Sequence, residues 1–186
     1  MAKQRSLKRT GKIFVRHERC MACHACELAC AVAHSAARDL RAAIAAGERP
    51  QRRLAVESYQ DQAVPVHCNH CDDAPCRLVC PSGAIHRDEE GGPVLFNREN
   101  CIGCRMCVQA CPFGVLTVDR EGRSVLKCDL CVARLAEGLE PACVAACPSG
   151  ALTFGEEEAA LRTKRRTAAG RIVAARESAR AKEGRE

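Results

Sequence analysis

Hydrophobic residues along the chain fall into short runs that alternate with cysteine-rich segments. Residues 13–15 (Ile-Phe-Val) and 94–96 (Val-Leu-Phe) are two such runs, and each ends a few residues before a group of cysteines. Runs of this length predict short strands. The pattern therefore predicts an α+β fold in which short strands, cysteine loops and short helices repeat.

A unit of the form Cys-Pro-x-Gly-hydrophobic occurs three times. The sequence PSGAI follows Cys80, PFGVLTV follows Cys111, and PSGALTF follows Cys147. We expect the proline to end a short helix, the glycine to permit a tight turn, and the apolar pair to begin a strand. An internal repeat of this kind indicates that one structural unit is used several times.

The end of the chain has a different composition. Residues 156–186 contain no cysteine and no proline, and three glutamates after Gly155 suit the positive end of a helix dipole. We expect a helix that docks on a partner subunit or on the next copy of the protein, with a solvated tail as the alternative. The basic residues 1–11 are expected to be flexible. The apolar residues at helical spacing are Leu161, Ala168, Ile172, Ala175 and Ala179.

Cysteine is the unusual residue in the composition. The 186 residues include 16 cysteines, whereas aromatic residues make up 3% and Trp is absent from the sequence. So few bulky side chains fill only a small core, so that another interaction has to hold the loops together. The length allows one domain or a tightly fused pair.

The redox compartment limits which cysteine chemistry applies. Residues 1–20 contain no apolar run of signal-peptide length, and no later segment reaches the roughly 18 apolar residues that a membrane helix needs. We therefore expect a cytoplasmic protein with reduced thiols, unless a partner carries an export signal for both. Reduced thiols favour metal binding over disulfides.

The positive charge lies at the two ends of the chain. The formal net charge is +6, with a balance of +6 in residues 1–19, +3 in residues 156–186 and −3 between them. Because cysteine binds metal as the thiolate, a metal-loaded chain would be more negative than this formal charge. Basic residues are not interleaved with stacking aromatic residues, so nucleic acid is not an expected partner.

The cysteines form four groups of four. The first and third groups have the C-x2-C-x2-C-x3-C spacing of bacterial ferredoxins, in which three thiolates hold one cluster and the fourth holds its neighbour. The second and fourth groups have longer middles but keep the opening C-x2-C and the closing C-x3-C-P. Zinc sites have no use for that closing pattern, so iron-sulfur clusters are favoured over zinc and disulfides. The groups are Cys20, Cys23, Cys26, Cys30; Cys68, Cys71, Cys76, Cys80; Cys101, Cys104, Cys107, Cys111; and Cys128, Cys131, Cys143, Cys147.

This order of spacings resembles the four-cluster iron-sulfur subunits of molybdopterin and tungstopterin oxidoreductases, formate hydrogenlyase and carbon monoxide dehydrogenase. The opening CMACHACELACAVAHS is similar to that of short members, among them the small subunit of a tungsten aldehyde oxidoreductase. The resemblance implies two interleaved bacterial-ferredoxin-like modules in residues 12–155, followed by the docking extension. The outer module would comprise 12–34 and 122–155, the inner module 63–121, and a helical and strand insertion 31–62.

One departure from the ferredoxin run is Ala31, which stands where proline usually follows the last cysteine of a group. Without that proline, the helix can continue into AVAHSAARDLRAAIAAG. We therefore predict one helix from residue 31 to about 46.

The resemblance also implies crossed ligation of four [4Fe-4S] clusters, in which the last cysteine of each group binds with the first three of another. We name these sets sites A to D. Site A is Cys20, Cys23, Cys26 and Cys147; site B is Cys128, Cys131, Cys143 and Cys30; site C is Cys68, Cys71, Cys76 and Cys111; site D is Cys101, Cys104, Cys107 and Cys80.

These features predict a non-catalytic electron-transfer subunit. With every ligand position taken by cysteine, no iron is open to substrate, and no nucleophile elbow, phosphate loop or nicotinamide fingerprint is present. The expected partner is a tungsten or molybdenum aldehyde or formate oxidoreductase, or a nickel carbon monoxide dehydrogenase or hydrogenase. Further copies of the chain or a flavin subunit are additional candidates. The alternatives are a free polyferredoxin, a self-assembling chain of clusters and a zinc-binding regulator.

Several residues beside the cysteines have two readings. His24 and His70 lie inside ligand runs and could replace a cysteine, although a role in hydrogen bonding or simple exposure is favoured. Lys127 and Arg105 adjoin cysteines and could tune cluster potentials, or they could be surface residues without redox effect. His67 and Asn69 have no assigned role.

Overall fold

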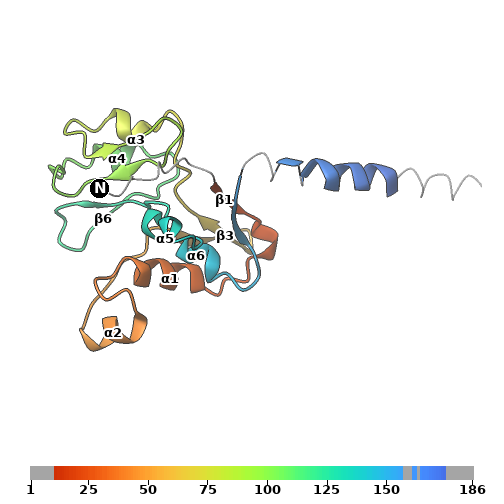
Figure 1. Cartoon of the computed structure of the whole chain (residues 1–186), viewed down its shortest axis with the longest axis horizontal. Helices are drawn as coiled ribbons and strands as arrows, with labels where there is room; N and C mark the ends of the chain where they lie inside the picture. The colour runs from red at the N-terminus through yellow and green to blue at the C-terminus, as the bar shows by residue number, and fades with distance from the viewer. Residues whose placement is uncertain (1–10, 157–160, 163, 175–186) are drawn as a thin grey trace, which may run out of the picture.

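The computed structural model describes residues 11–156, 161–162 and 164–174 (Figure 1). The fold is α+β, built from short strands and short helices, as the pattern of hydrophobic runs predicts. The helices are α1 (Ala25–Ala33), α2 (Leu40–Ala45), α3 (Pro75–Leu78), α4 (Met106–Ala110), α5 (Val132–Ala136) and α6 (Ala142–Ala145), with a 3-10 turn at His17–Arg19. The strands are β1 (Lys12–Val15), β2 (Ala55–Tyr59), β3 (Gln62–Val66), β4 (Ile85–His86), β5 (Leu95–Phe96), β6 (Thr117–Val118), β7 (Val125–Leu126) and β8 (Leu152–Gly155).

The strands pair as separate antiparallel ribbons, β1 with β8, β2 with β3, β4 with β5 and β6 with β7. The strands expected at 13–15 and 94–96 are thus present as β1 and β5, the second shortened by one residue. In the β1–β8 ribbon, Ile13 lies opposite Phe154 and Val15 opposite Leu152. This ribbon ties the start of the described chain to the strand that follows the last cysteine.

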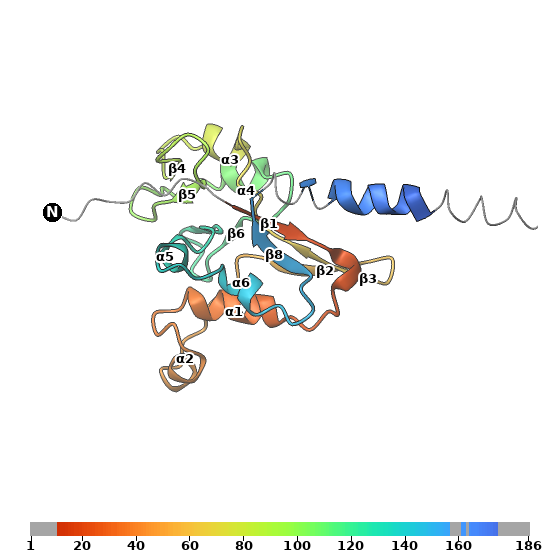
Figure 2. The same cartoon turned by 45° about the vertical axis from the view of Figure 1, so that its right-hand side comes forward.

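Cysteines form part of both hydrophobic cores. The two cores correspond to two lobes, one containing α3, α4, β4 and β5, the other α1, α5 and α6 (Figures 1 and 2). Because aromatic residues are scarce, thiols occupy places that larger apolar side chains fill in other small domains. The first core contains Cys68, Cys76 and Cys107 with Ile85, Val94, Val115, Leu116 and Val125. The second contains Cys26, Cys30 and Cys143 with Ile13, Leu54, Leu130, Val144 and Leu152.

The prediction of one helix from 31 to about 46 is wrong. Helix α1 ends at Ala33, only three residues past Cys30, and α2 begins at Leu40. The Glu48 carboxylate accepts from the backbone amides of Ala36 and Ala37, at 2.9 and 3.1 Å, and so stabilises a non-helical turn. Absence of proline allowed a helix, but these hydrogen bonds from Glu48, which lies beyond α2, stabilise the break.

The C-terminal extension is helical where it is described. Residues 161–162 and 164–174 are helical and extend away from both lobes (Figures 1 and 2). Leu161, Ile172 and Val173 are all exposed there. Three expectations fall on residues outside the described part. They concern the apolar positions Ala175 and Ala179, the second and third glutamates of the extension, and the basic residues 1–10. In the part of the chain that is described, no helix combines the length and apolar character needed to cross a bilayer.

Candidate iron-sulfur cluster sites

The cysteine loops curl tightly because several non-glycine residues adopt left-handed backbone angles. Examples are His24 (φ 56°) in the first group, His70 (φ 48°) in the second and Arg105 (φ 62°) in the third. Such angles carry a strain of about 1 kcal/mol or more per residue. They also turn successive amides toward one concave side, where negative charge is stabilised.

Two small cavities are lined by cysteines from distant groups. One is lined by Cys20, Cys23 and Cys26 together with Cys147, which is the set named site A. The other is lined by the set named site C, Cys68, Cys71 and Cys76 with Cys111. The structure thus brings together thiols that lie far apart in the sequence.

The electrostatic neighbours of two further buried thiols include members of their own proposed sets. Burial raises the pKa of Cys143 to about 12, and the negative charges of Cys30 and Cys131 in site B add to the effect. Burial likewise raises the pKa of Cys107 to about 11, with contributions from Cys80 and Cys104 in site D.

These thiols fit the cofactor that the sequence predicts. All sixteen cysteines are free of disulfides in the structure, and converging buried thiolates need positive charge to compensate them. Iron-sulfur clusters held by four thiolates provide that charge.

The closing cysteines of two repeated units accept hydrogen bonds. The amide of Ile85 donates to Sγ of Cys80 at 3.5 Å, and the amide of Leu152 donates to Sγ of Cys147 at 3.4 Å. Burial acts to raise the pKa of both thiols, but these amides and nearby serine hydroxyls outweigh it and lower the pKa. The expected turn glycines lie in each unit with φ between 62° and 65°.

The histidines of the ligand runs differ in environment. His24 is exposed and its Nδ1 lies 3.1 Å from the Glu27 carboxylate. His70 is buried, and its Nδ1 accepts from the amide of Val94 at 3.1 Å. Burial lowers the pKa of His70 to about 3, helped by the charge of Lys127, so that the ring is neutral. His67 is also buried, and its Nδ1 donates to the carbonyl of Cys68.

The two cations singled out in the sequence are placed differently. Lys127 is 2% exposed, and its Nζ lies 3.6 Å from Sγ of Cys68. Arg105 is exposed, and its guanidinium donates to the carbonyl of Gly122 at 2.9 Å.

A charged network beside site B was not foreseen. His34 donates from Nδ1 to the carbonyl of Cys30 at 2.7 Å and from Nε2 to Asp129 at 3.0 Å, and Arg53 pairs with Asp129 at 3.1 Å. Burial acts to lower the pKa of His34, but hydrogen bonds to Asp129, Cys131 and Cys30 outweigh it and raise the pKa to about 12. The only signal in the sequence is that His34 follows Cys30 by one helical turn.

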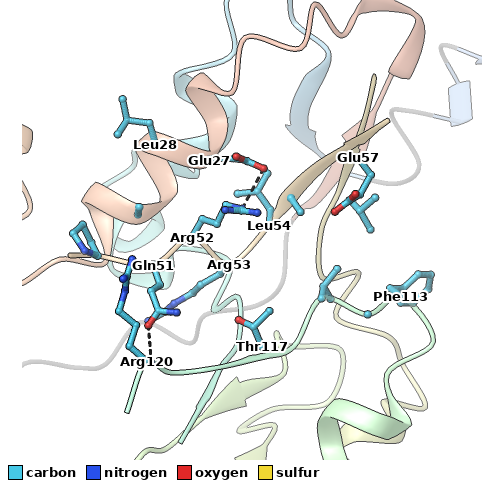
Figure 3. Close-up of a pocket in the computed structure, with 16 residues that line it drawn as sticks. Glu27, Leu28, Gln51, Arg52, Arg53, Leu54, Glu57, Phe113, Thr117 and Arg120 are labelled. Atoms are coloured by element: carbon cyan, nitrogen blue, oxygen red, sulfur yellow. Dashed lines mark hydrogen bonds and ion pairs between the residues drawn. The ribbon is translucent and has the colours of Figure 1, made fainter. Parts of the chain in front are cut away.

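A further cavity has no cysteine in its lining. It has a volume of about 680 Å³ and lies between α1, residues 50–57 and residues 113–120 (Figure 3). Arg52 pairs with Glu27 at 3.2 Å, and the amide of Arg120 donates to Gln51 at 3.0 Å. These two contacts join polar groups that line the cavity.

Comparison with known proteins identifies the family of this cysteine arrangement. A model described as "4Fe-4S dicluster domain" matches residues 59–157, and a "4Fe-4S binding domain" model matches residues 17–33. The chain belongs to the 4Fe-4S dicluster domain family. The resemblance to ferredoxin-like electron-transfer subunits is therefore confirmed, as is the expectation of [4Fe-4S] clusters as cofactor.

Two relatives of this chain are named as an iron-sulfur protein and as an electron transfer subunit. An "Iron-sulfur protein" of Rhodospirillum rubrum is 43% identical over 68% of this chain and 70% of that protein. The "Thiosulfate reductase electron transfer subunit PhsB" of Salmonella typhi is 38% identical over 74% of this chain and 71% of that protein. Among solved structures, the "Active site complex BamBC of Benzoyl Coenzyme A reductase in complex with Zinc" includes a chain with a TM-score of 0.43 and 21% identity, over 88% of this chain and 94% of that one.

Proposed function

We propose that the chain holds four [4Fe-4S] clusters, one each in sites A to D, and passes electrons between a catalytic oxidoreductase subunit and another redox carrier. The observation that carries this proposal is the gathering of distant cysteines, seen most directly in the cavities lined by the sets of sites A and C. A [4Fe-4S] cluster accepts and releases one electron at a time. The crossed sets divide the fold into the outer and inner interleaved modules expected from the sequence.

Electrostatic and packing relations between neighbouring sites support a linear relay in the order A–B–C–D. The pKa of Cys143 in site B is raised by burial and, among other charges, by Cys26 of site A. Burial raises the pKa of Cys128 in site B well above its usual range, and the charge of Cys68 in site C adds to this. Cys107 of site D and Cys76 of site C share one core.

The two ends of this relay reach the surface. Cys23 of site A and Cys104 of site D are exposed, whereas Cys30, Cys131 and Cys143 of site B are buried. Sites A and D are therefore the proposed points of electron entry and exit, because each has an exposed cysteine and sites B and C have none.

We propose a tungsten or molybdenum aldehyde or formate oxidoreductase, or a nickel enzyme, as the catalytic partner in the cytoplasm. The name of the PhsB relative, an electron transfer subunit of a reductase, supports a catalytic partner in general. The exposed C-terminal helix supports docking, because Arg162, Lys164, Arg165, Arg166 and Arg171 lie there among apolar residues without an acidic residue between them.

Anaerobic purification from the native host tests the proposal. We expect about sixteen irons and about sixteen acid-labile sulfides per chain, with a large pterin or nickel subunit co-eluting. About four zincs and almost no iron would overturn the cluster assignment. A loaded monomer at every concentration on gel filtration would instead identify a free polyferredoxin.

Removing residues 157–186 tests the docking helix. We expect the shortened chain to keep its iron but to lose the co-eluting subunit, because the helix makes the contact. A second variant replaces Arg165 and Arg166 by glutamine in the full-length chain, which removes charge without changing the length and should weaken co-elution of the subunit. If the subunit still co-elutes with the shortened chain, the docking role is wrong.

A further inference from the structure

Lys127 places an ammonium group inside the protein at the boundary of two cysteine sets. It lies between β7 and Cys128 and is 2% exposed. Its Nζ donates to the carbonyls of Val94 at 2.5 Å and of Cys128 at 3.0 Å, and lies 3.6 Å from Sγ of Cys68. The charge therefore sits against site C, with site B directly beside it.

Among the described residues, no carboxylate forms an ion pair with Lys127. A buried ammonium needs a compensating negative charge, since desolvation costs several kcal/mol. The negative groups beside it are thiolates, above all that of Cys68.

The other described cation that contacts a cysteine sulfur is in a different situation. His34 lies 3.7 Å from Sγ of Cys30 at site B, but it shares Asp129 with Arg53. Arg105 at site D is exposed, where water screens its charge. Lys127 thus gives site C a positive charge that no ion pair with a carboxylate of the described residues neutralises.

We propose that Lys127 raises the reduction potential of the cluster held by Cys68, Cys71, Cys76 and Cys111. This inference rests on the proposed function. One-electron reduction takes a cluster with four thiolates from a charge of minus two to minus three, without bond breaking or proton transfer. A fixed cation stabilises the more negative form more strongly, so the electron is held there more tightly.

The structure also offers a purely mechanical role, which the test has to separate. The amide of Val94 donates to His70 while its carbonyl accepts from Lys127, so Lys127 helps to clamp the loop that carries Cys68 and Cys71. Lys127→Gln keeps a donor for this clamp but removes the charge, and Lys127→Arg keeps the charge.

Redox titration of the anaerobically purified full chain, followed by electron paramagnetic resonance, measures the effect. A Cys71→Ser variant assigns the signal of site C. In Lys127→Gln we expect the reduction of the site C cluster to become about tenfold less favourable. Its reduction potential should then be about 59 mV lower for a one-electron couple, with the iron content unchanged. Lys127→Arg should restore the potential, and the exposed control Arg105→Gln should leave the site C signal in place.

Two results would overturn the role of Lys127 while leaving the four clusters intact. They are an unchanged potential in Lys127→Gln, and equal shifts in Lys127→Gln and Lys127→Arg. Loss of iron in both variants from a loaded wild type would make Lys127 a structural residue and would also overturn it. A wild-type chain without iron would overturn the proposed function instead.

Discussion

At the scale of single residues, the two serines of the repeated unit set its closing cysteines apart. The hydroxyl of Ser82 lies 3.8 Å from Sγ of Cys80, and that of Ser149 lies 3.7 Å from Sγ of Cys147. A sulfur that ligates iron carries no proton, so the hydroxyl is the donor. The corresponding residue after Cys111 is Phe113, which has no donor.

Exchanging these side chains should move two potentials in opposite directions. Ser149→Ala removes a donor to a site A sulfur. The equilibrium constant for reduction of that cluster should fall about threefold, which lowers its potential by about 30 mV for one electron. Phe113→Ser adds a donor beside Cys111 and should raise the potential of site C. Potentiometric titration of the loaded chain measures both, and movement in the same direction would contradict the hydrogen-bond explanation.

Residues near a cysteine in the sequence were identifiable, but their partners were not. The sequence indicates Lys127 as a candidate because it adjoins Cys128, yet the sulfur that its ammonium group contacts belongs to Cys68. His34 and Asp129 are 95 positions apart in the chain. Spacing rules report ligands because ligand loops are local, whereas the groups that surround them come from distant turns.

At the scale of elements, the cysteine loops depend on close contacts with neighbouring turns. Gly103 lies between two cysteines of the third group with φ +73°, and a Cβ there would lie 3.0 Å from the carbonyl oxygen of Arg123 in the β6–β7 turn. Gly114 has φ +62° but no atom within 4 Å of a Cβ. The two glycines therefore share a backbone conformation and differ in available space.

Alanine at these two positions separates strain from contact. Gly114→Ala should destabilise the loaded chain by about 1 kcal/mol through backbone strain alone. Gly103→Ala should cost more, because the Arg123 carbonyl must also move, and should speed loss of iron from site D. Thermal loss of cluster absorbance under argon compares them, and equal midpoints would show that the contact is unimportant.

Short strands and turns were predictable because their signals are local. Strand β1 follows from the short apolar run at residues 13–15, and the turn glycines follow from the Cys-Pro-x-Gly unit. The break after α1 was not predictable from the absence of proline, since the amides of Ala36 and Ala37 are satisfied by Glu48 from beyond α2. A tertiary hydrogen bond of this kind leaves no mark on local periodicity.

At the scale of the whole molecule, the cofactor and the fold depend on each other. Both cores contain cysteines whose sulfurs, without metal, repel one another as thiolates and pack as small groups as thiols. In small domains with sparse apolar cores, metal binding supplies much of the free energy of folding.

Removing the iron should therefore unfold both lobes. We expect chelation under argon to abolish slow amide exchange at core positions such as Ile85 and Leu152, with loss of helical circular dichroism. Mock treatment without chelator is the control. A chelated chain with native exchange protection would show that the apolar residues suffice.

The pairing of β1 with β8 places a constraint on biosynthesis. Lys12 pairs with Gly155, so β1 receives its partner only after the residues between the two strands have left the ribosome. During this time the thiols of the first group lack Cys147, the fourth ligand proposed for site A, while the ribbon of β4 and β5 can already close. Maturation would then proceed from the middle of the chain outward, and a nascent chain stalled before Cys147 would present its earliest thiols to oxygen.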